Sequence, residues 1–186
     1  MTVTAIYVRS ARRKNAGNAM TIQIQRYKLY VATSTSGSAG PFGDQRFAFA
    51  WGLEDEDGKI VDRDSNPFGE GGKGDHTKGT FPAIRAGVSK LNGVQVDVVT
   101  SQEYAANLLN QPANERRARG YRKSNGKALA DRDELSNLDA ELELRQIAMA
   151  GRSPTGLIEA NRLNSLHDWA YQKAKFGDAT PSDWGI

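Results

Sequence analysis

Residues 30–43 read YVATSTSGSAGPFG, and this stretch decides how the rest of the sequence is interpreted. Just before its loop, residues 21–33 alternate in polarity and are rich in β-branched and aromatic side chains, which predicts a strand. Residues 37–43 contain three glycines and a proline, which predict a loop. The pattern therefore indicates a strand that runs directly into a turn.

Strand and helix patterns alternate along the remaining chain. Strand patterns recur at residues 46–54, 59–64, 94–100 and 144–149, and the turn signal Asp57-Gly58 joins the first two. Helical spacing follows from Thr80 or Phe81 to the stop at Asn92-Gly93, from a Ser101 cap through residues 104–109, at residues 131–142 and at residues 157–175. Residues 66–79 contain five glycines and predict a mobile loop.

The composition excludes several classes of protein. The chain has 186 residues and no cysteine, so neither a disulfide framework nor a thiolate metal site is available. It contains no apolar run near the roughly 20 residues that cross a bilayer, and no secretion signal at its start. We expect a cytoplasmic protein with no membrane contact: a basic arm at residues 1–20, one domain at residues 21–175 and a tail at residues 176–186.

Charge is unevenly distributed. The net charge is +3, but residues 1–19 alone carry +4, so the rest is slightly acidic. Met20 follows this arm and is an alternative start. Residues 115–127 carry a net charge of +5, whereas residues 53–65 carry −4. These clusters, rather than the overall charge, indicate where nucleic acid would bind.

Three further motifs accompany the opening stretch. Residues 98–104 read VVTSQEY, residues 119–121 read RGY with Lys127 following, and leucines recur at helical spacing over residues 135–142. With these motifs, residues 27–175 resemble type I ribonuclease H. The resemblance implies an α/β, ribonuclease H-like fold with a five-stranded mixed sheet flanked by helices, in the order βββαβα, helix, strand, helix. It also implies that the strand containing Ala32 is central and lies beside the strand ending at Thr100.

The resemblance does not extend to the chemistry of the family. Ribonuclease H cleaves the RNA strand of an RNA–DNA hybrid with two magnesium ions, which four carboxylates hold. Ala32, Pro82 and Ser101 occupy three of the four positions. The fourth falls on Asp168, or on Ser165 or Arg162 in a shifted register. We therefore expect no catalytic residue, no metal site and no cofactor, with Asp168 as a remnant.

The basic segment corresponds to the protrusion with which the family contacts its substrate. The resemblance implies nucleic-acid contacts at Arg116, Arg117, Arg119, Tyr121, Arg122, Lys123 and Lys127. Arginines and lysines suit phosphates, and an interleaved tyrosine suits an unpaired base. An exposed, merely solubilising loop is the alternative interpretation.

Three functions remain open at this point. The first is a catalytically inactive module that binds RNA–DNA hybrid, duplex or single strand. The second is a scaffold with a protein partner. The degenerate connection domain of retroviral reverse transcriptases is a precedent, since it resembles this fold but lacks its active site. The third is a divergent, magnesium-dependent ribonuclease H with relocated acids. A phage or viral origin would suit a fold whose active site has decayed.

Overall fold

The computed structural model describes residues 24–37, 45–70 and 76–177. The predicted arm at residues 1–20, the alternative start at Met20 and nearly all of the predicted tail lie outside these residues. So do most of the loop predicted at residues 37–43 and the middle of the one predicted at residues 66–79. Everything below refers to the described part of the chain.

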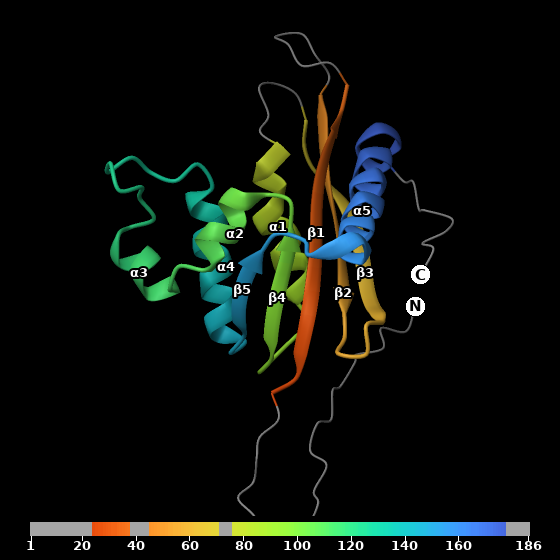
Figure 1. Cartoon of the computed structure of the whole chain (residues 1–186). Helices are drawn as coiled ribbons and strands as arrows, with labels where there is room; N and C mark the ends of the chain where they lie inside the picture. The colour runs from red at the N-terminus through yellow and green to blue at the C-terminus, as the bar shows by residue number, and fades with distance from the viewer. Residues whose placement is uncertain (1–23, 38–44, 71–75, 178–186) are drawn as a thin grey trace, which may run out of the picture.

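A single mixed sheet organises the domain (Figure 1). Its strands, in the spatial order β3-β2-β1-β4-β5, are β1 (Arg26–Ser36), β2 (Arg46–Glu54), β3 (Ile60–Glu70), β4 (Gln95–Thr100) and β5 (Ala148–Arg152). β1 pairs antiparallel with β2 and parallel with β4, with Tyr30 opposite Val99 and Val31 opposite Thr100. This confirms the predicted fold and the central position of the strand that contains Ala32.

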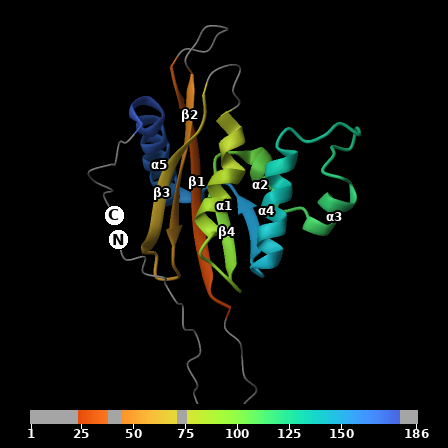
Figure 2. The same ribbon diagram turned by 180° about the vertical axis from the view of Figure 1, so that it is seen from behind.

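Helices cover both faces of the sheet. They are the short 3-10 helix η1 (His76–Gly79) and the α-helices α1 (Thr80–Val88), α2 (Glu103–Leu109), α3 (Ala113–Ala118), α4 (Arg132–Leu144) and α5 (Gly156–Phe176). α1 and α4 lie on one face and α5 on the other (Figure 2). None of the described helices is long and apolar enough to cross a bilayer.

The alternation of β1 divides the core into two layers. Leu29 and Val31 pack with side chains of α1 and α4, whereas Tyr30 and Ala32 pack with side chains of α5. Gly87 lets α1 lie close to the sheet, because a Cβ there would lie 2.5 Å from Cδ1 of Leu29. Both faces of β1 are thus buried, which fixes its place at the centre.

Some predicted boundaries were wrong. β5 begins at Ala148 rather than at residue 144, because α4 continues to Leu144 and the Ile147 N–H then closes the helix on the Leu142 carbonyl. The N-cap of α2 is Gln102, not Ser101, and it makes no side-chain capping bond. Part of the predicted loop at residues 66–79 is regular, since β3 runs to Glu70 and η1 starts at His76.

Candidate nucleic-acid interface

Ala32, at the first position of the metal site in the resembled family, lies in an apolar environment. It is 6 % exposed and faces α5. Its cluster is formed by side chains from β1, β2, β4 and α5: Tyr30, Ala50, Val99, Leu163, Leu166, Trp169 and Ala170. An ion of high charge density requires oxygen ligands, and this cluster offers it hydrocarbon.

The other three positions also lack a metal-binding arrangement. Pro82 is in the first turn of α1, and Ser101 is exposed just after β4. The Asp168 side chain is 84 % exposed, while its neighbours Leu166 and Trp169 pack toward the sheet. No group of three or more histidine, aspartate or glutamate side chains that could hold a metal occurs among the described residues. The described side chains at these positions do not fit a two-magnesium site.

The neighbouring part of α5 brings a serine and a histidine together. Oγ of Ser34 lies 3.3 Å from Nε2 of His167, and Nδ1 of His167 lies 3.8 Å from Oδ1 of Asp168. The grouping has the residue types of a hydrolytic triad, but Ser34 is only 4 % exposed. The contact therefore ties α5 to β1 and does not present a nucleophile to solvent.

A buried polar network holds the first half of α5 to the sheet. Glu54, counted with the acidic hairpin in the sequence, is only 3 % exposed. It accepts hydrogen bonds from the Tyr30 hydroxyl at 3.0 Å and from Nζ of Lys28 at 3.1 Å, and it pairs with Arg162. Arg162 also donates to the Gly58 carbonyl, so it anchors the helix to the hairpin rather than lying at a metal site.

Arg152 and Glu159 form a second tie between β5 and α5. The guanidinium donates two hydrogen bonds to the carboxylate, at 2.6 and 2.7 Å, and Thr155 adds its N–H and hydroxyl. The hydrogen bonds from Arg152 lower the pKa of Glu159 from 4.5 to about 2. The carboxylate is thus held in its charged form.

This pKa predicts acid sensitivity. The pKa of Glu159 is lower in the folded than in the unfolded protein, so its carboxylate contributes to the free energy of unfolding above about pH 4.5. This contribution is about 3 kcal/mol, and it is lost as the pH falls toward about 2. We expect Glu159→Gln to lower the free energy of unfolding at pH 7 and to weaken its pH dependence below pH 4.5, measured by urea titration. Glu143→Gln, which removes an exposed ion pair, should cost less than about 1 kcal/mol.

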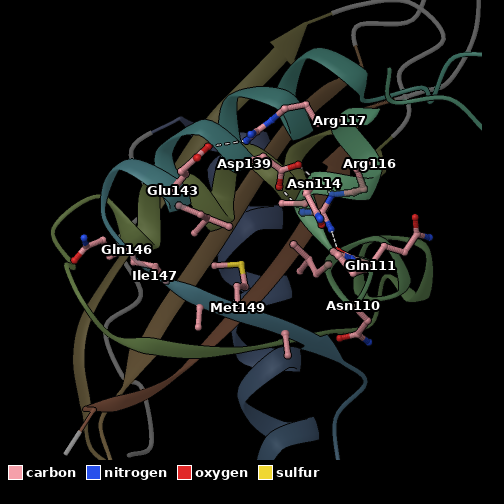
Figure 3. Close-up of a pocket in the computed structure, with 16 residues that line it drawn as sticks. Asn110, Gln111, Asn114, Arg116, Arg117, Asp139, Glu143, Gln146, Ile147 and Met149 are labelled. Atoms are coloured by element: carbon pink, nitrogen blue, oxygen red, sulfur yellow. Dashed lines mark hydrogen bonds and ion pairs between the residues drawn. The ribbon is translucent and has the colours of Figure 1, made fainter. Parts of the chain in front are cut away.

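The predicted protrusion consists of α3 and the loop that leads to α4, and two of its residues are buried. Arg116 is 5 % exposed: its guanidinium forms an ion pair with Asp139 of α4 and donates to the carbonyl of Gln111 (Figure 3). It also donates to the carbonyl of Leu108. Tyr121 is 7 % exposed, has a φ of 54° and packs in the core. The structure gives both residues a structural place, and we remove them from the proposed nucleic-acid contacts.

The other five basic residues of the protrusion are exposed. Arg117 pairs with Glu143 at 2.8 Å, and Arg119 pairs with Glu115 at 3.2 Å. Arg122 donates to the Gly126 carbonyl, a neutral acceptor. Lys123 and Lys127 have no carboxylate within ion-pair distance in the part of the chain that the structure describes. The exposed charge is therefore least compensated at Arg122, Lys123 and Lys127.

A cleft of about 430 Å³ lies between α2 and this loop. Arg119, Arg122 and Lys123 line it together with Tyr104 of α2. Tyr104 opens the helical spacing predicted for residues 104–109, yet its side chain is 38 % exposed. Nothing in the sequence indicated that Tyr104, directly before the two buried alanines of α2, lines a cleft. The cleft forms only because the loop at residues 119–129 folds back beside α2.

Comparison with known proteins supports the fold alone. No protein-family model matches the chain, and no curated protein matches it. The foamy viral protease-reverse transcriptase in complex with RNA/DNA hybrid matches with a TM-score of 0.64 and 15 % identity, over 92 % of this chain and 23 % of that longer one. The solution structure of the PFV RNase H domain matches with a TM-score of 0.60 and 15 % identity, over 82 % of this chain and 96 % of that one.

A ribonuclease H1 matches as well. LC11-RNase H1, isolated from compost by a metagenomic approach, gives a TM-score of 0.55 at 16 % identity, over 81 % of this chain and 98 % of that one. Matches to isolated ribonuclease H domains thus span nearly the whole of each domain. Together with the strand order and register, they show that this chain has the ribonuclease H fold.

Proposed function

We propose that this protein is a non-catalytic module of ribonuclease H fold that binds nucleic acid through the basic cleft beside α2. The cleft carries the proposal, because it combines a concave surface, three exposed cationic side chains and an exposed aromatic ring. Phosphates bind such cations, and unpaired bases stack on such rings. The foamy viral protease-reverse transcriptase that this chain resembles in fold was determined with RNA/DNA hybrid, which is consistent with this ligand class.

The ion pairs of the protrusion predict which of its basic residues contribute most to phosphate binding. Arg117 and Arg119 must exchange a carboxylate for a phosphate, whereas Lys123 and Lys127 have no carboxylate partner among the described residues to give up. Exposed pairs of this kind contribute only about 0.2–1 kcal/mol, so the exchange is inexpensive but not free. Arg122, Lys123 and Lys127 should therefore contribute most to phosphate binding.

A salt titration tests this proposal. Labelled hybrid, duplex and single strand are titrated at two salt concentrations, with magnesium present and with a chain that begins at Met20, so that the basic arm does not contribute. Replacing Arg122 and Lys123 by alanine should flatten the slope of log affinity against log salt by roughly one to two units. Lys59→Ala, on the hairpin at the opposite edge of the sheet, removes one exposed charge and should leave binding unchanged.

Tyr104 separates the ligand classes. Since stacking requires an unpaired base, Tyr104→Ala should weaken single-strand binding by about 1–3 kcal/mol and duplex binding by less. Equal losses for both ligands would argue against stacking. If the unaltered chain that begins at Met20 binds none of the three ligands at low salt, the binding proposal is wrong and the protein-scaffold alternative takes its place.

A further inference from the structure

Two hollows lie on either side of the turn that joins α2 to α3. One is the basic cleft beside α2, and the other is a cavity of about 580 Å³ beside β5. Gln111 and Arg116 line both of them, so the two hollows share a wall. A ligand bound in the cleft therefore lies next to the cavity.

The two hollows differ in charge. The described residues that line the cleft include four cations and no carboxylate: Arg116, Arg119, Arg122 and Lys123. In the lining of the cavity, Arg116 pairs with Asp139 and Arg117 pairs with Glu143, so the charges of the described residues cancel. Phosphates suit the cleft, whereas the cavity suits a neutral group.

The lining of the cavity matches a flat ring with a polar edge. Met149 of β5 lies near its middle, with Ile147 beside it (Figure 3). A methionine thioether makes favourable contacts with aromatic rings. Asn114 of α3 adds an amide, which can both donate and accept hydrogen bonds. The volume lies within the roughly 300–1,000 Å³ of sites that hold small organic molecules.

An extended peptide matches the cavity poorly, because the edge of β5 is closed. Oδ1 of Asn110 accepts from the Gly151 N–H at 3.0 Å, and Nδ2 of Asn110 donates to the Gly151 carbonyl at 2.8 Å. The Ile147 N–H donates to the Leu142 carbonyl at 2.9 Å. A peptide that adds to a sheet needs the outward backbone groups of several residues. The cavity therefore favours a group that inserts without pairing with the strand.

We propose that the cavity beside β5 holds one unpaired nucleobase of a strand whose phosphates lie in the basic cleft, an inference that rests on the proposed function. A base is neutral and aromatic, and its edge carries hydrogen-bond donors and acceptors. Proteins that take a base out of its strand hold it against apolar side chains and bond its edge. The base enters past Arg117, whose ion pair with Glu143 is exposed and therefore weak. The protein then prefers a ligand with an unpaired base over an intact duplex.

A change in the ligand alone tests this inference. Two duplexes are compared on the full chain: one carries a single bulged nucleotide, and the other carries the same bulge without its base. The two ligands have the same phosphates, so the slope of log affinity against log salt should be equal for both. We expect the bulged base to raise the affinity on the order of tenfold over the abasic bulge.

Ala113→Trp separates the cavity from the cleft. Ala113, the first residue of α3, lines the cavity but is not among the residues that line the cleft, so an indole there fills the cavity. In this variant the bulged base and the abasic bulge should bind alike, with an unchanged salt slope. Ala118→Trp places the same side chain at the exposed end of the same helix and should retain the difference. Thermal unfolding checks that both variants are folded.

Three results would overturn the inference. Equal binding of the bulged base and the abasic bulge to the unaltered chain would show that no base enters the cavity. A difference that persists in Ala113→Trp would place the base elsewhere, on Tyr104 for example. A nucleoside monophosphate that binds as tightly as the bulged duplex would identify a free nucleotide as the ligand. The proposed function fails in a different way, by the loss of binding to every nucleic acid at low salt.

Discussion

Asp139→Asn is expected to lower the free energy of unfolding by about 3–5 kcal/mol, because it leaves the guanidinium of Arg116 buried without its counter-ion. Both side chains are almost inaccessible: 4 % of Arg116 and none of Asp139 is exposed. The loss should appear as a lower urea midpoint with an unchanged slope.

The double variant Arg116→Met with Asp139→Leu is the informative control. Removing both charges together should recover most of the stability, since well-packed apolar side chains often replace a buried pair without loss. A double variant that is as unstable as Asp139→Asn would show instead that the hydrogen bonds of Arg116 to the carbonyls of Leu108 and Gln111 dominate.

The pair also links the core to the proposed binding surface. Arg116 lines the cleft beside α2 and also the cavity beside β5. Its ion pair fixes α3 against α4, and its carbonyl contacts fix the turn after α2. The exposed cations that follow in the sequence are therefore carried on a segment that a buried charge positions.

The sequence predicted the features that depend on local pattern. Alternation in residues 21–33 and the loop after them located the central strand, and helical spacing located α5 to within a residue at each end. The predicted start of β5 was wrong because Leu144 is compatible with both helix and strand. In the structure it is 82 % exposed at the end of α4, and the hydrogen bond from the Ile147 N–H to the Leu142 carbonyl ends the helix there.

Burial of charged residues was not predictable in the same way. Arg116 and Arg117 are adjacent and chemically identical in the sequence, yet one is buried and the other is half exposed. The difference arises from Asp139, 23 residues away, on a different helix. Glu54 likewise looks like one acid among six in the hairpin segment, but Tyr30 and Arg162 enclose it after folding.

The purified protein is expected to show no cleavage of RNA–DNA hybrid with magnesium or manganese. In the alignment that the resemblance implies, Ala32, Pro82 and Ser101 stand at three of the four carboxylate positions, and a single lost electrostatic contact at a reacting centre costs about 10²–10³-fold in rate. We therefore expect any rate to lie more than about 10⁴-fold below that of an active ribonuclease H. Activity that disappears in Asp168→Asn would contradict the proposal of a non-catalytic module.

Restoring the acidic residues tests why no cleavage is expected. In a variant carrying Ala32→Asp, Pro82→Glu and Ser101→Asp, the first carboxylate enters the apolar cluster of Leu166 and Trp169. Burying it should raise its pKa and cost on the order of 3 kcal/mol, because desolvation in this apolar cluster disfavours the charged form. Thermal unfolding with and without magnesium measures the result. A protein that binds the ion would be stabilised by it, whereas an apolar environment at Ala32 predicts no shift of the melting temperature.

Ala32→Asn is the control for the size of the new side chain. Asparagine is nearly equal in size to aspartate but uncharged, so this variant separates the cost of added volume from the cost of buried charge. A magnesium-dependent rise in the melting temperature of the triple variant, absent from Ala32→Asn, would show that the fold retains the geometry of the metal site and has lost only its ligands.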